Sequence, residues 1–401
     1  MDITRMIKRQ TIDDIEKQAQ KIATMMERIR ESLLAPSAAK VPPSLSSVQM
    51  ADLCGLDKAK ITYRMTRGDL PQGSTVGNRR QWTLEEAQVW MRDLRASHLR
   101  PDGVAGITLT IANFKGGVAK TTSAVTLAQG LSMRGHKVLL IDLDPQGSAT
   151  TLFGFLPDTD VEINSTATNL FTGAEDDLQY AIRKTYWPGI DLVCAAPLLF
   201  SSEFVLPARQ AKDPDFEFWR VLDYGLDGAR DKYDVIVIDT PPSLSYLTIN
   251  ALMAADGVIM PLPPSLLDFA SSAQFWDLFS DLCNQLLRGR GKTKSFEFID
   301  VLLSRVEASD TASSIVRQWV LEGYGDKVLP IEIPKTSIAA SSSAEFGTVY
   351  DMAPGSANSR TVARAKDAYN RMCELVEQQI EAVWERQLQE RRELEGKAKS
   401  S

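Results

Sequence analysis

The sequence predicts an α/β fold whose core is a doubly wound, mainly parallel β-sheet with helices on both faces. Seven apolar segments of strand length alternate with segments of helical periodicity. These strand segments are apolar almost continuously, as is typical of strands that are buried on both faces. Ligands bind at the carboxyl ends of the strands in such sheets, so we expect the chemistry there. The predicted strands span residues 107–114, 137–144, 190–196, 234–240, 257–263, 298–304 and 327–333.

Length and composition bound the remaining possibilities. The chain has 401 residues, enough for two or three domains, and 44% apolar with 24% charged residues is an ordinary globular composition. Because the formal charge is −7, contacts with nucleic acid must come from local basic patches. The four cysteines are scattered and there are only two histidines, which argues against a zinc site or a disulfide framework. No signal peptide or long apolar run occurs, which predicts a cytoplasmic protein.

Residues 1–44 contain a charged segment with one apolar seam, followed by a linker rich in proline and small residues. The apolar residues recur at spacings of three and four over about three heptads, a width that suits a partner helix. We interpret the segment as a dimerisation helix. A helix folded back on its own domain is the alternative, because three heptads is short for a coiled coil. The seam consists of Ile12, Ile15, Ala19, Ile22, Met26, Ile29 and Leu33.

Residues 45–100 have the proportions of a DNA-binding unit. A short helix, a turn at Gly55 and a second helix at 58–66 have helix-turn-helix spacing, and a polar hairpin around 73–80 would form a wing. Residues 57–100 carry nine Lys and Arg against five Asp and Glu, a local charge of +4. The arrangement resembles the winged MerR-like module, whose second helix enters the major groove. The alternative is a structural or protein-binding module with a solvated face. The candidate DNA-binding residues are Lys58, Lys60, Arg64, Arg67, Arg79 and Arg80.

A phosphate-binding loop follows the first predicted strand of the sheet. Residues 115–122 read Lys-Gly-Gly-Val-Ala-Lys-Thr-Thr, and a helical segment follows. Glycines let backbone N–H groups approach phosphate oxygens, and the helix N-terminus adds its positive dipole end. Lys120 supplies a point charge and Thr121 a hydroxyl for Mg²⁺. Phe114 and Ala119 stand where the usual pattern has glycines, and a methyl group at 119 could crowd the phosphates. A plain glycine turn is the alternative.

Carboxylates end two further predicted strands. Asp142 and Asp144 close one strand, and alternation places their side chains on the same side, one deeper than the other. Asp239 follows four apolar residues at the end of another strand, where a carboxylate can hold Mg²⁺ as in a Walker B strand. An Asp-Pro pair can also simply begin a turn, which is the alternative for Asp144. Thr121 and Asp239 are therefore candidate metal ligands, and the family resemblance described next implies that Asp142 also lies near the Mg²⁺ shell.

The motif that starts with Lys115 resembles the deviant P-loop of the ParA/MinD family of P-loop NTPases. In that family the early lysine reaches the phosphates of the nucleotide held by the partner subunit, so the resemblance implies an ATP-dependent sandwich dimer. It also implies that ATP or ADP binds with Mg²⁺, and that Asp144 matches the residue that positions the attacking water. The catalytic candidates are then Lys115, Lys120 and Asp144. The nucleotide-binding candidates are Lys115, Gly116, Gly117, Val118, Ala119, Lys120, Thr121, Thr122 and, unless its amide is structural, Asn250.

The C-terminal part carries cations that the resemblance connects with non-specific DNA binding. Lys335 is nearly isolated among neutral residues, whereas Arg360 and Arg364 lie one helical turn apart on a later helix. A solvated helix face is the alternative for this pair. We expect an ATPase domain at 101–375 and a charged helix at 376–401. That helix lacks the basic, strongly apolar character of a membrane-surface helix, which counts against a MinD-like protein.

The resemblance predicts a ParA-type DNA partition ATPase of the larger class that has an N-terminal operator-binding domain. Such a protein binds ATP, forms dimers or filaments, coats nucleoid DNA non-specifically, and releases it when a ParB-type centromere-binding protein stimulates slow hydrolysis. It also represses its own operon. Two alternatives are a MinD-like membrane positioning ATPase and a nucleotide-responsive transcriptional repressor with no transport role.

Overall fold

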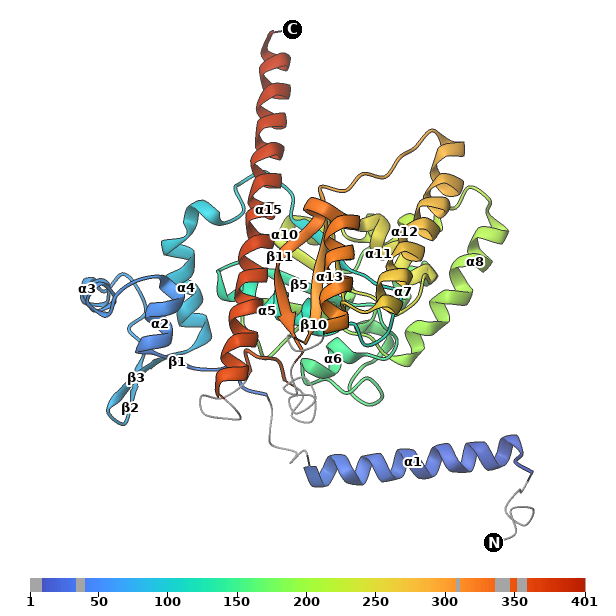
Figure 1. The fold of residues 1–401 in the computed structure, drawn as a ribbon, viewed down its shortest axis with the longest axis horizontal. Helices are drawn as coiled ribbons and strands as arrows, with labels where there is room; N and C mark the ends of the chain where they lie inside the picture. The colour runs from blue at the N-terminus through green and yellow to red at the C-terminus, as the bar shows by residue number, and fades with distance from the viewer. Residues whose placement is uncertain (1–8, 34–39, 308–310, 336–346, 352–358, 401) are drawn as a thin grey trace. The chain divides into compact units, whose positions relative to one another are not determined.

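The computed structural model describes residues 9–33, 40–307, 311–335, 347–351 and 359–400. The chain divides into two compact units, Met1–Val41 and Pro42–Ser401, and each is considered by itself. The first unit contains one described helix, and the second contains all the described strands (Figure 1). The boundary that the sequence suggested after residue 100 therefore falls inside one compact unit.

Helix α1 (Ile12–Leu33) is the described part of the predicted dimerisation helix. It begins with reciprocal capping: the Thr11 N–H donates to Asp14 Oδ2 at 2.9 Å, and the Asp14 N–H donates to the Thr11 hydroxyl at 3.3 Å. Within its own unit the described part of the apolar seam is open to solvent. The exposed seam residues are Ile12, Ile15, Ala19 and Ile22, while Met26, Ile29 and Leu33 lie outside the described side chains.

The second unit begins with residues 45–100, which we call the winged segment. Its elements are β1 (Leu45–Ser46), α2 (Ser47–Cys54), α3 (Lys58–Arg67), β2 (Ser74–Val76), β3 (Arg79–Trp82) and α4 (Leu84–Leu94). Gly55 ends α2 in left-handed backbone with φ 62°, which favours glycine and turns the chain towards α3. Strands β2 and β3 form an antiparallel hairpin, to which β1 adds on the other side of β3. The two helices and the hairpin occur in the predicted order.

An eight-stranded sheet forms the centre of the second unit, in the order β11-β10-β9-β4-β8-β5-β7-β6. The strands are β4 (Ile107–Ile111), β5 (Val138–Asp142), β6 (Arg183–Lys184), β7 (Ile190–Val193), β8 (Val235–Asp239), β9 (Gly257–Leu262), β10 (Phe298–Val306) and β11 (Val328–Pro334). Every pairing is parallel except that of β6 with β7. The α/β prediction is confirmed, and all seven predicted strands are present. The edge strand β6 escaped prediction because two residues carry no periodicity.

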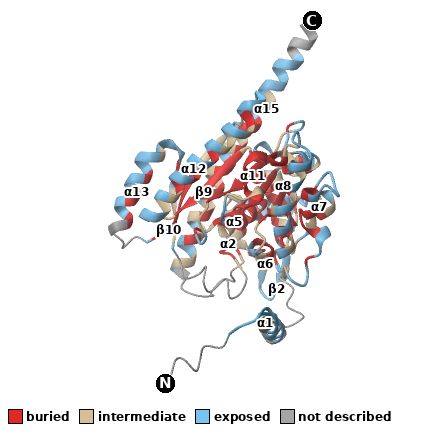
Figure 2. Cartoon of the chain, turned by 90° about the vertical axis from the view of Figure 1, so that its right-hand side faces the viewer, coloured by how far each residue is buried: buried red, intermediate tan, exposed pale blue. Residues whose placement is uncertain are grey.

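Helices cover both faces of the sheet, whose strands are buried (Figure 2). Alternate strand residues belong to two different cores. The helices are α5 (Lys120–Met133), α6 (Ser148–Leu152), α7 (Thr168–Thr172), α8 (Ser202–Lys212), α9 (Val221–Gly225), α10 (Asp227–Lys232), α11 (Tyr246–Ala254), α12 (Leu266–Leu287), α13 (Thr311–Tyr324) and α15 (Ser359–Ser400). Leu140 and Val237 face a core shared with α5 and α15, whereas Ile141 and Ile238 face one shared with α8, α11 and α12. Burial on both sides explains the continuous apolar runs of the sequence.

Helix α15 crosses the boundary predicted at residue 376 without a break. Val376, Ile380 and Trp384 are buried and continue its apolar face, and the Trp384 indole N–H donates to the Ala105 carbonyl at 3.2 Å. The helix therefore stays part of the core past the predicted boundary, and its last turns project from the second unit (Figure 1). Among the described residues, no helix is both long and apolar enough to span a membrane.

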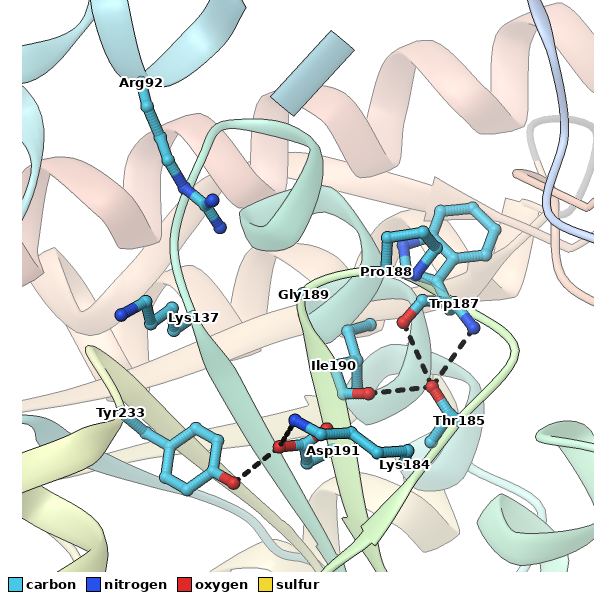
Figure 3. A pocket seen from close by; sticks show the side chains of 10 residues that line it. All are labelled: Arg92, Lys137, Lys184, Thr185, Trp187, Pro188, Gly189, Ile190, Asp191 and Tyr233. Atoms are coloured by element: carbon cyan, nitrogen blue, oxygen red, sulfur yellow. Dashed lines mark hydrogen bonds and ion pairs between the residues drawn. The ribbon is translucent and has the colours of Figure 1, made fainter. Parts of the chain in front are cut away.

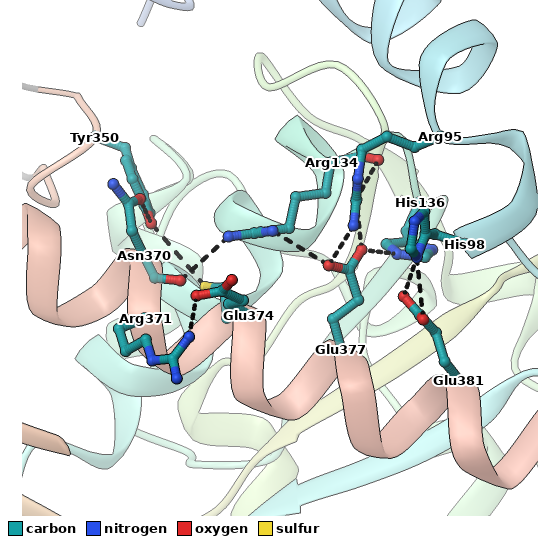
Figure 4. Close-up of polar contacts among 11 residues, drawn as sticks. Arg95, His98, Arg134, His136, Tyr350, Asn370, Arg371, Glu374, Glu377 and Glu381 are labelled. Atoms are coloured by element: carbon teal, nitrogen blue, oxygen red, sulfur yellow. Dashed lines mark hydrogen bonds and ion pairs between the residues drawn. The ribbon is translucent and has the colours of Figure 1, made fainter. Parts of the chain in front are cut away.

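Glu377 of α15 is a buried carboxylate that joins three parts of the second unit (Figure 4). Its oxygens accept hydrogen bonds from the Arg95 guanidinium at 2.7 and 2.8 Å and from His136 Nε2 at 2.7 Å, and Arg134 adds an ion pair at 3.2 Å. Because Arg95 follows α4 while Arg134 and His136 follow α5, the carboxylate ties both helices to α15. Burial raises the pKa of Glu377, but the hydrogen bonds and positive charges outweigh it and lower the pKa to about 2.

Replacement of Glu377 by glutamine should lower the free energy of unfolding by about 3 kcal/mol at pH 7, because three cationic or polar partners lose a buried charge. A folded-state pKa below the ordinary glutamate value of 4.5 contributes stability that is present above that pH and lost as the pH falls towards 2. The difference between E377Q and wild type should therefore shrink over this window. Urea unfolding at a series of pH values measures it.

Glu381→Gln is the matched control on the same helix. Its partner His98 is about half exposed, so the loss should stay below about 1 kcal/mol. Equal losses in the two variants, or a loss in E377Q that does not change with pH, would contradict the role given to the Glu377 carboxylate.

Candidate nucleotide-binding site

The loop between β4 and α5 lies at the carboxyl edge of the sheet, where ligands bind in folds of this class. Gly117 and Ala119 both adopt left-handed backbone, each with φ 74°. Glycine adopts this region without strain, whereas for alanine it costs about 1 kcal/mol. The departure from glycine at position 119 therefore stores strain in the loop immediately before the first residue of α5.

The two lysines of the loop have different partners. Lys120 is 7% exposed, and its Nζ donates to the Lys115 carbonyl at 2.8 Å. Burial lowers the pKa of Lys120, and the negative charges of Asp239 and Asp144 oppose that shift. The Lys115 side chain instead pairs with Asp268 in the first turn of α12, with 3.1 Å between Nζ and Oδ1. One lysine is thus buried among the carboxylates of the site, and the other is held by a neighbouring helix.

Three carboxylates lie near Lys120. Asp142 and Asp239 are register partners on the neighbouring strands β5 and β8, and Asp144 follows β5. Asp142 accepts hydrogen bonds from the N–H and hydroxyl of Thr150 at 2.9 and 2.8 Å, and from the Asp144 N–H at 3.1 Å. Burial raises the pKa of Asp142 to about 7 and also raises the pKa of Asp144. The predicted carboxylates are therefore brought together, but Asp142 is already engaged within the protein.

Asp239 differs from its neighbours because both of its oxygens are buried without a hydrogen-bond partner among the described residues. Burial and the charge of Asp142 raise its pKa well above the usual value, and the nearby Thr121 hydroxyl and Lys120 only partly offset them. A buried carboxylate without a partner is costly unless a cation compensates it. Mg²⁺ prefers oxygen ligands of this kind, so Asp239 and Thr121 fit a magnesium ion.

Asn250 is the one predicted nucleotide contact that the protein itself engages fully. It is buried in α11, and its Nδ2 donates to the Phe218 and Tyr246 carbonyls, both at 2.9 Å. Its Oδ1 accepts from the Leu222 N–H at 3.1 Å. Because both amide N–H donors are used within the fold, the geometry favours the structural alternative over a contact with nucleotide.

The sequence did not predict three residues that contact the loop. Asp268 pairs with Lys115, the buried Ser304 hydroxyl donates to a loop carbonyl, and so does the Arg305 guanidinium. Ser304 and Arg305 lie at the end of β10. The available signal was their position at the carboxyl end of a predicted strand, which the fold class identifies as the ligand edge.

The candidate DNA-binding residues fall into two groups. Arg64 pairs with an aspartate of α4, Arg80 donates to a backbone carbonyl at 2.6 Å, and Lys335 pairs with Glu307, so the protein itself engages these three. The others are exposed, and two of them, Lys60 and Arg67, form ion pairs at 3.8 Å with Asp57 and Asp69 between side chains that are themselves exposed. The exposed residues are Lys58, Lys60, Arg67 and Arg79 in the winged segment, and Arg360 and Arg364 at the start of α15.

A hollow of about 260 Å³ lies at the amino ends of the strands, opposite the ends that carry the loop (Figure 3). The starts of β5 and β7 and Arg92 of α4 line it, far along the strands from the phosphate-binding loop. Its charges are partly neutralised, because Asp191 pairs with Lys184 at 2.8 Å and accepts from the Tyr233 hydroxyl at 2.6 Å. The buried carboxylates and lysine lie at the other edge, so the loop, and not this hollow, remains the candidate nucleotide site.

Residues 106–288 match a family model described as an AAA domain. Three related proteins extend the similarity. A "Putative replication protein A" from Rhizobium rhizogenes is 30% identical over 389 residues, which cover 93% of this chain and 95% of that protein. SopA of Escherichia coli K12 is 30% identical over 364 residues, covering 88% and 92%. The chromosome partitioning protein ParA of Caulobacter vibrioides is 32% identical over 252 residues, covering 61% and 87%.

Two solved structures are also similar. Cobyrinic acid a,c-diamide synthase from Mycobacterium smegmatis, with a bound ATP analogue and magnesium, is 28% identical with a TM-score of 0.52, covering 67% of this chain and 93% of that one. A partition protein with 22% identity has a TM-score of 0.58 and covers 82% and 95%, a likeness of fold alone. The similarity to SopA and ParA over most of their lengths shows that the chain belongs to the ParA-type family of partition ATPases.

Proposed function

We propose that this protein is a DNA partition ATPase that binds ATP or ADP with Mg²⁺, hydrolyses ATP slowly and forms an ATP-dependent homodimer. The observation that carries the proposal is the buried, unpartnered carboxylate of Asp239 beside Thr121 and Lys120. In the full cycle the protein is cytoplasmic and associated with the nucleoid. A dimer or filament binds DNA non-specifically, a ParB-type partner stimulates hydrolysis, and the protein represses its own operon. Its kinship with SopA and ParA supports this cycle.

Each part of the site has a chemical task in this proposal. The loop N–H groups and Lys120 bind the phosphates, and the N-terminus of α5 adds its positive dipole end. Asp239 and Thr121 would hold Mg²⁺, which would supply positive charge to offset the negative charge on the phosphates. Asp144 orients the attacking water, and orientation of this kind is a large part of catalysis in phosphoryl transfer. Asp142 accepts the Asp144 N–H and so fixes the start of the segment that carries the water-orienting carboxylate.

Dimerisation depends on Lys115 in this proposal. The ammonium group pairs with Asp268 of the same chain, so it has to leave that carboxylate before it can reach a nucleotide on a second copy. The exchange costs little, because the lysine side chain is 36% exposed and ion pairs in contact with water are weak. The exposed apolar seam of α1 supplies a second contact between copies that needs no nucleotide.

Two surfaces bind DNA in the proposal. The exposed cations of the winged segment, Lys58, Lys60, Arg67 and Arg79, bind the operator through α3 and the hairpin. Arg360 and Arg364 bind nucleoid DNA through its phosphates, so this second mode should weaken steeply as salt rises.

A nucleotide-responsive repressor is a second candidate function. Arg92 of α4 donates to the Gly135 carbonyl at 2.9 Å, and Arg95 donates to the Arg134 carbonyl at 3.2 Å. Both carbonyls directly follow α5, whose first residue is Lys120. The winged segment thus contacts the far end of the helix that begins at the phosphate-binding loop. This contact gives nucleotide binding a route to the operator-binding surface without any transport role.

Asp144→Ala should abolish ATP turnover, by more than about a hundredfold, and leave ATP affinity nearly unchanged, because the side chain orients water without holding the nucleotide. Turnover is measured with and without duplex DNA and the product of the neighbouring downstream gene. Low basal turnover that both ligands raise would support the partition cycle. Asp176→Asn, at an exposed carboxylate, is the control. If neither DNA nor the partner product changes turnover, while operator binding still depends on nucleotide, the partition cycle is contradicted and the repressor function remains.

Asp268→Asn should strengthen ATP-dependent dimerisation by about two- to fivefold, because Lys115 loses a competing charge. At the start of α12 the Ser265 hydroxyl accepts from the N–H of residue 268 and donates to the Asp268 carboxylate, and the amide oxygen of asparagine can still accept that bond, so the cap should remain. Sedimentation with a non-hydrolysable ATP analogue measures the dimer. Asp281→Asn, at an exposed position of the same helix, is the matched control. Weaker dimerisation in D268N would mean that the carboxylate positions Lys115 instead of restraining it.

Ile15→Glu combined with Ile22→Glu should abolish self-association of the full chain in the absence of nucleotide, because two charges would enter the apolar seam. Gln20→Glu, away from the seam on the same helix, should have little effect. If the seam variant associates like wild type in sedimentation without nucleotide, α1 is not a dimer contact.

A further inference from the structure

Arg305, near the end of β10, combines a strained backbone with a bulge in the sheet. Its φ is 53°, and Ala119 is the other non-glycine residue with left-handed backbone in the described part of the chain. The pairing of β10 with β11 shifts register between Leu303 and Val306, so the irregularity includes Arg305. Ala119 belongs to the phosphate-binding loop and Arg305 contacts it. Both strained residues therefore meet at one place, and strain of this kind clusters at functional sites.

The side chains at this bulge bind two successive peptide groups of the loop. The Arg305 guanidinium donates to the Gly117 carbonyl, and the buried Ser304 hydroxyl donates to the Val118 carbonyl at 2.9 Å. In a trans peptide the C=O and N–H groups point in opposite directions. The N–H groups of Val118 and Ala119 therefore point away from the end of β10. Within the described residues, neither of them donates to a protein acceptor.

We propose that Arg305 is a positioning residue for nucleotide binding, which together with Ser304 sets the direction of two successive loop N–H groups. Adjacent N–H groups that point to one side form an anion-binding concavity. Binding is tighter when their direction is fixed before the anion arrives, because less conformational freedom is lost. The inference rests on the proposed function, in which the anion is the phosphate of ATP. Side chains of a regular strand alternate between the two faces of the sheet. The left-handed backbone at Arg305 and the bulge interrupt this alternation and direct the side chain to the loop.

Three substitutions separate the side chain from the backbone strain. Arg305→Ala removes the guanidinium and keeps the strain, Arg305→Gly removes both, and Arg305→Lys keeps a cation. Affinity for Mg-ATP is measured by titration with a fluorescent analogue. We expect R305A and R305G each to weaken affinity by about tenfold, and R305K by less, because a charge-assisted hydrogen bond to the loop is lost. Turnover at saturating ATP should fall by less than about twofold, since the effect is on binding.

Arg317→Ala is the control for charge, because it removes a cation that pairs with Glu332 and does not touch the loop. It should leave affinity unchanged, and thermal unfolding without nucleotide should show all variants folded. Wild-type affinity in R305A or in R305G would overturn the inference, because the guanidinium would then be dispensable. If wild type itself fails to bind Mg-ATP, the proposed function falls and the inference falls with it. If wild type binds Mg-ATP and R305A binds it with the same affinity, only the inference about Arg305 is overturned, and the proposed function stands.

Discussion

The burial of charged groups at the carboxyl ends of β4, β5 and β8 is the constraint on which the rest of the structure depends. Lys120, Asp142 and Asp239 are each less than a tenth exposed, and desolvation costs several kcal/mol per buried ion. The sheet order makes their proximity possible, because β8 lies between β4 and β5. Hydrogen bonds from Thr150 to Asp142 and the attraction between Lys120 and the carboxylates offset part of this desolvation cost. Both Asp239 oxygens still have no hydrogen-bond partner among the described residues. Phosphates with a divalent cation carry the complementary charges, so a bound nucleotide would stabilise the fold that binds it.

Backbone strain adds to this electrostatic cost. Ala119 and Arg305 each hold a left-handed conformation that glycine would adopt more cheaply, at about 1 kcal/mol apiece. Such conformations persist only where the surroundings determine them. Here the loop carbonyls accept hydrogen bonds from Ser304 and Arg305 at the end of β10 and from Lys120. These contacts connect the loop that contains Ala119 with Arg305, so each strained residue is restrained by the other's segment. The electrostatic and conformational costs are therefore concentrated in the same few residues, and the large double-sided core of the sheet supplies the stability that offsets them.

Features that depend on residues close together in the sequence could be predicted, whereas contacts between residues far apart in the sequence could not. Apolar strands, caps and turns depend on neighbouring residues, and all seven strands, the hairpin and the loop were predicted. The carboxylates at 142, 144 and 239 were also predicted together, because parallel strands deliver their carboxyl ends to one edge. Contacts between distant residues were not predicted: Arg305 meets Gly117 across 188 positions, and neither residue type signals the pairing. The sequence also left the role of Asn250 open and did not show how far the C-terminal helix stays buried, since distant surroundings decide whether an amide is used and whether a helix is covered.

Helix α5 connects the two ends of this system. It begins at Lys120, and its 14 residues span about 21 Å to the region where Arg134 and His136 contact Glu377. Glu377 also binds Arg95, so one buried carboxylate supports the end of α5 and the winged segment together. A helix transmits displacement along its axis because its backbone hydrogen bonds resist stretching. If nucleotide binding displaces the start of α5, as the repressor candidate requires, the displacement must also change the charged contacts around Glu377. In that candidate function, the strength of these buried contacts determines whether the winged segment responds to a nucleotide at the other end of α5.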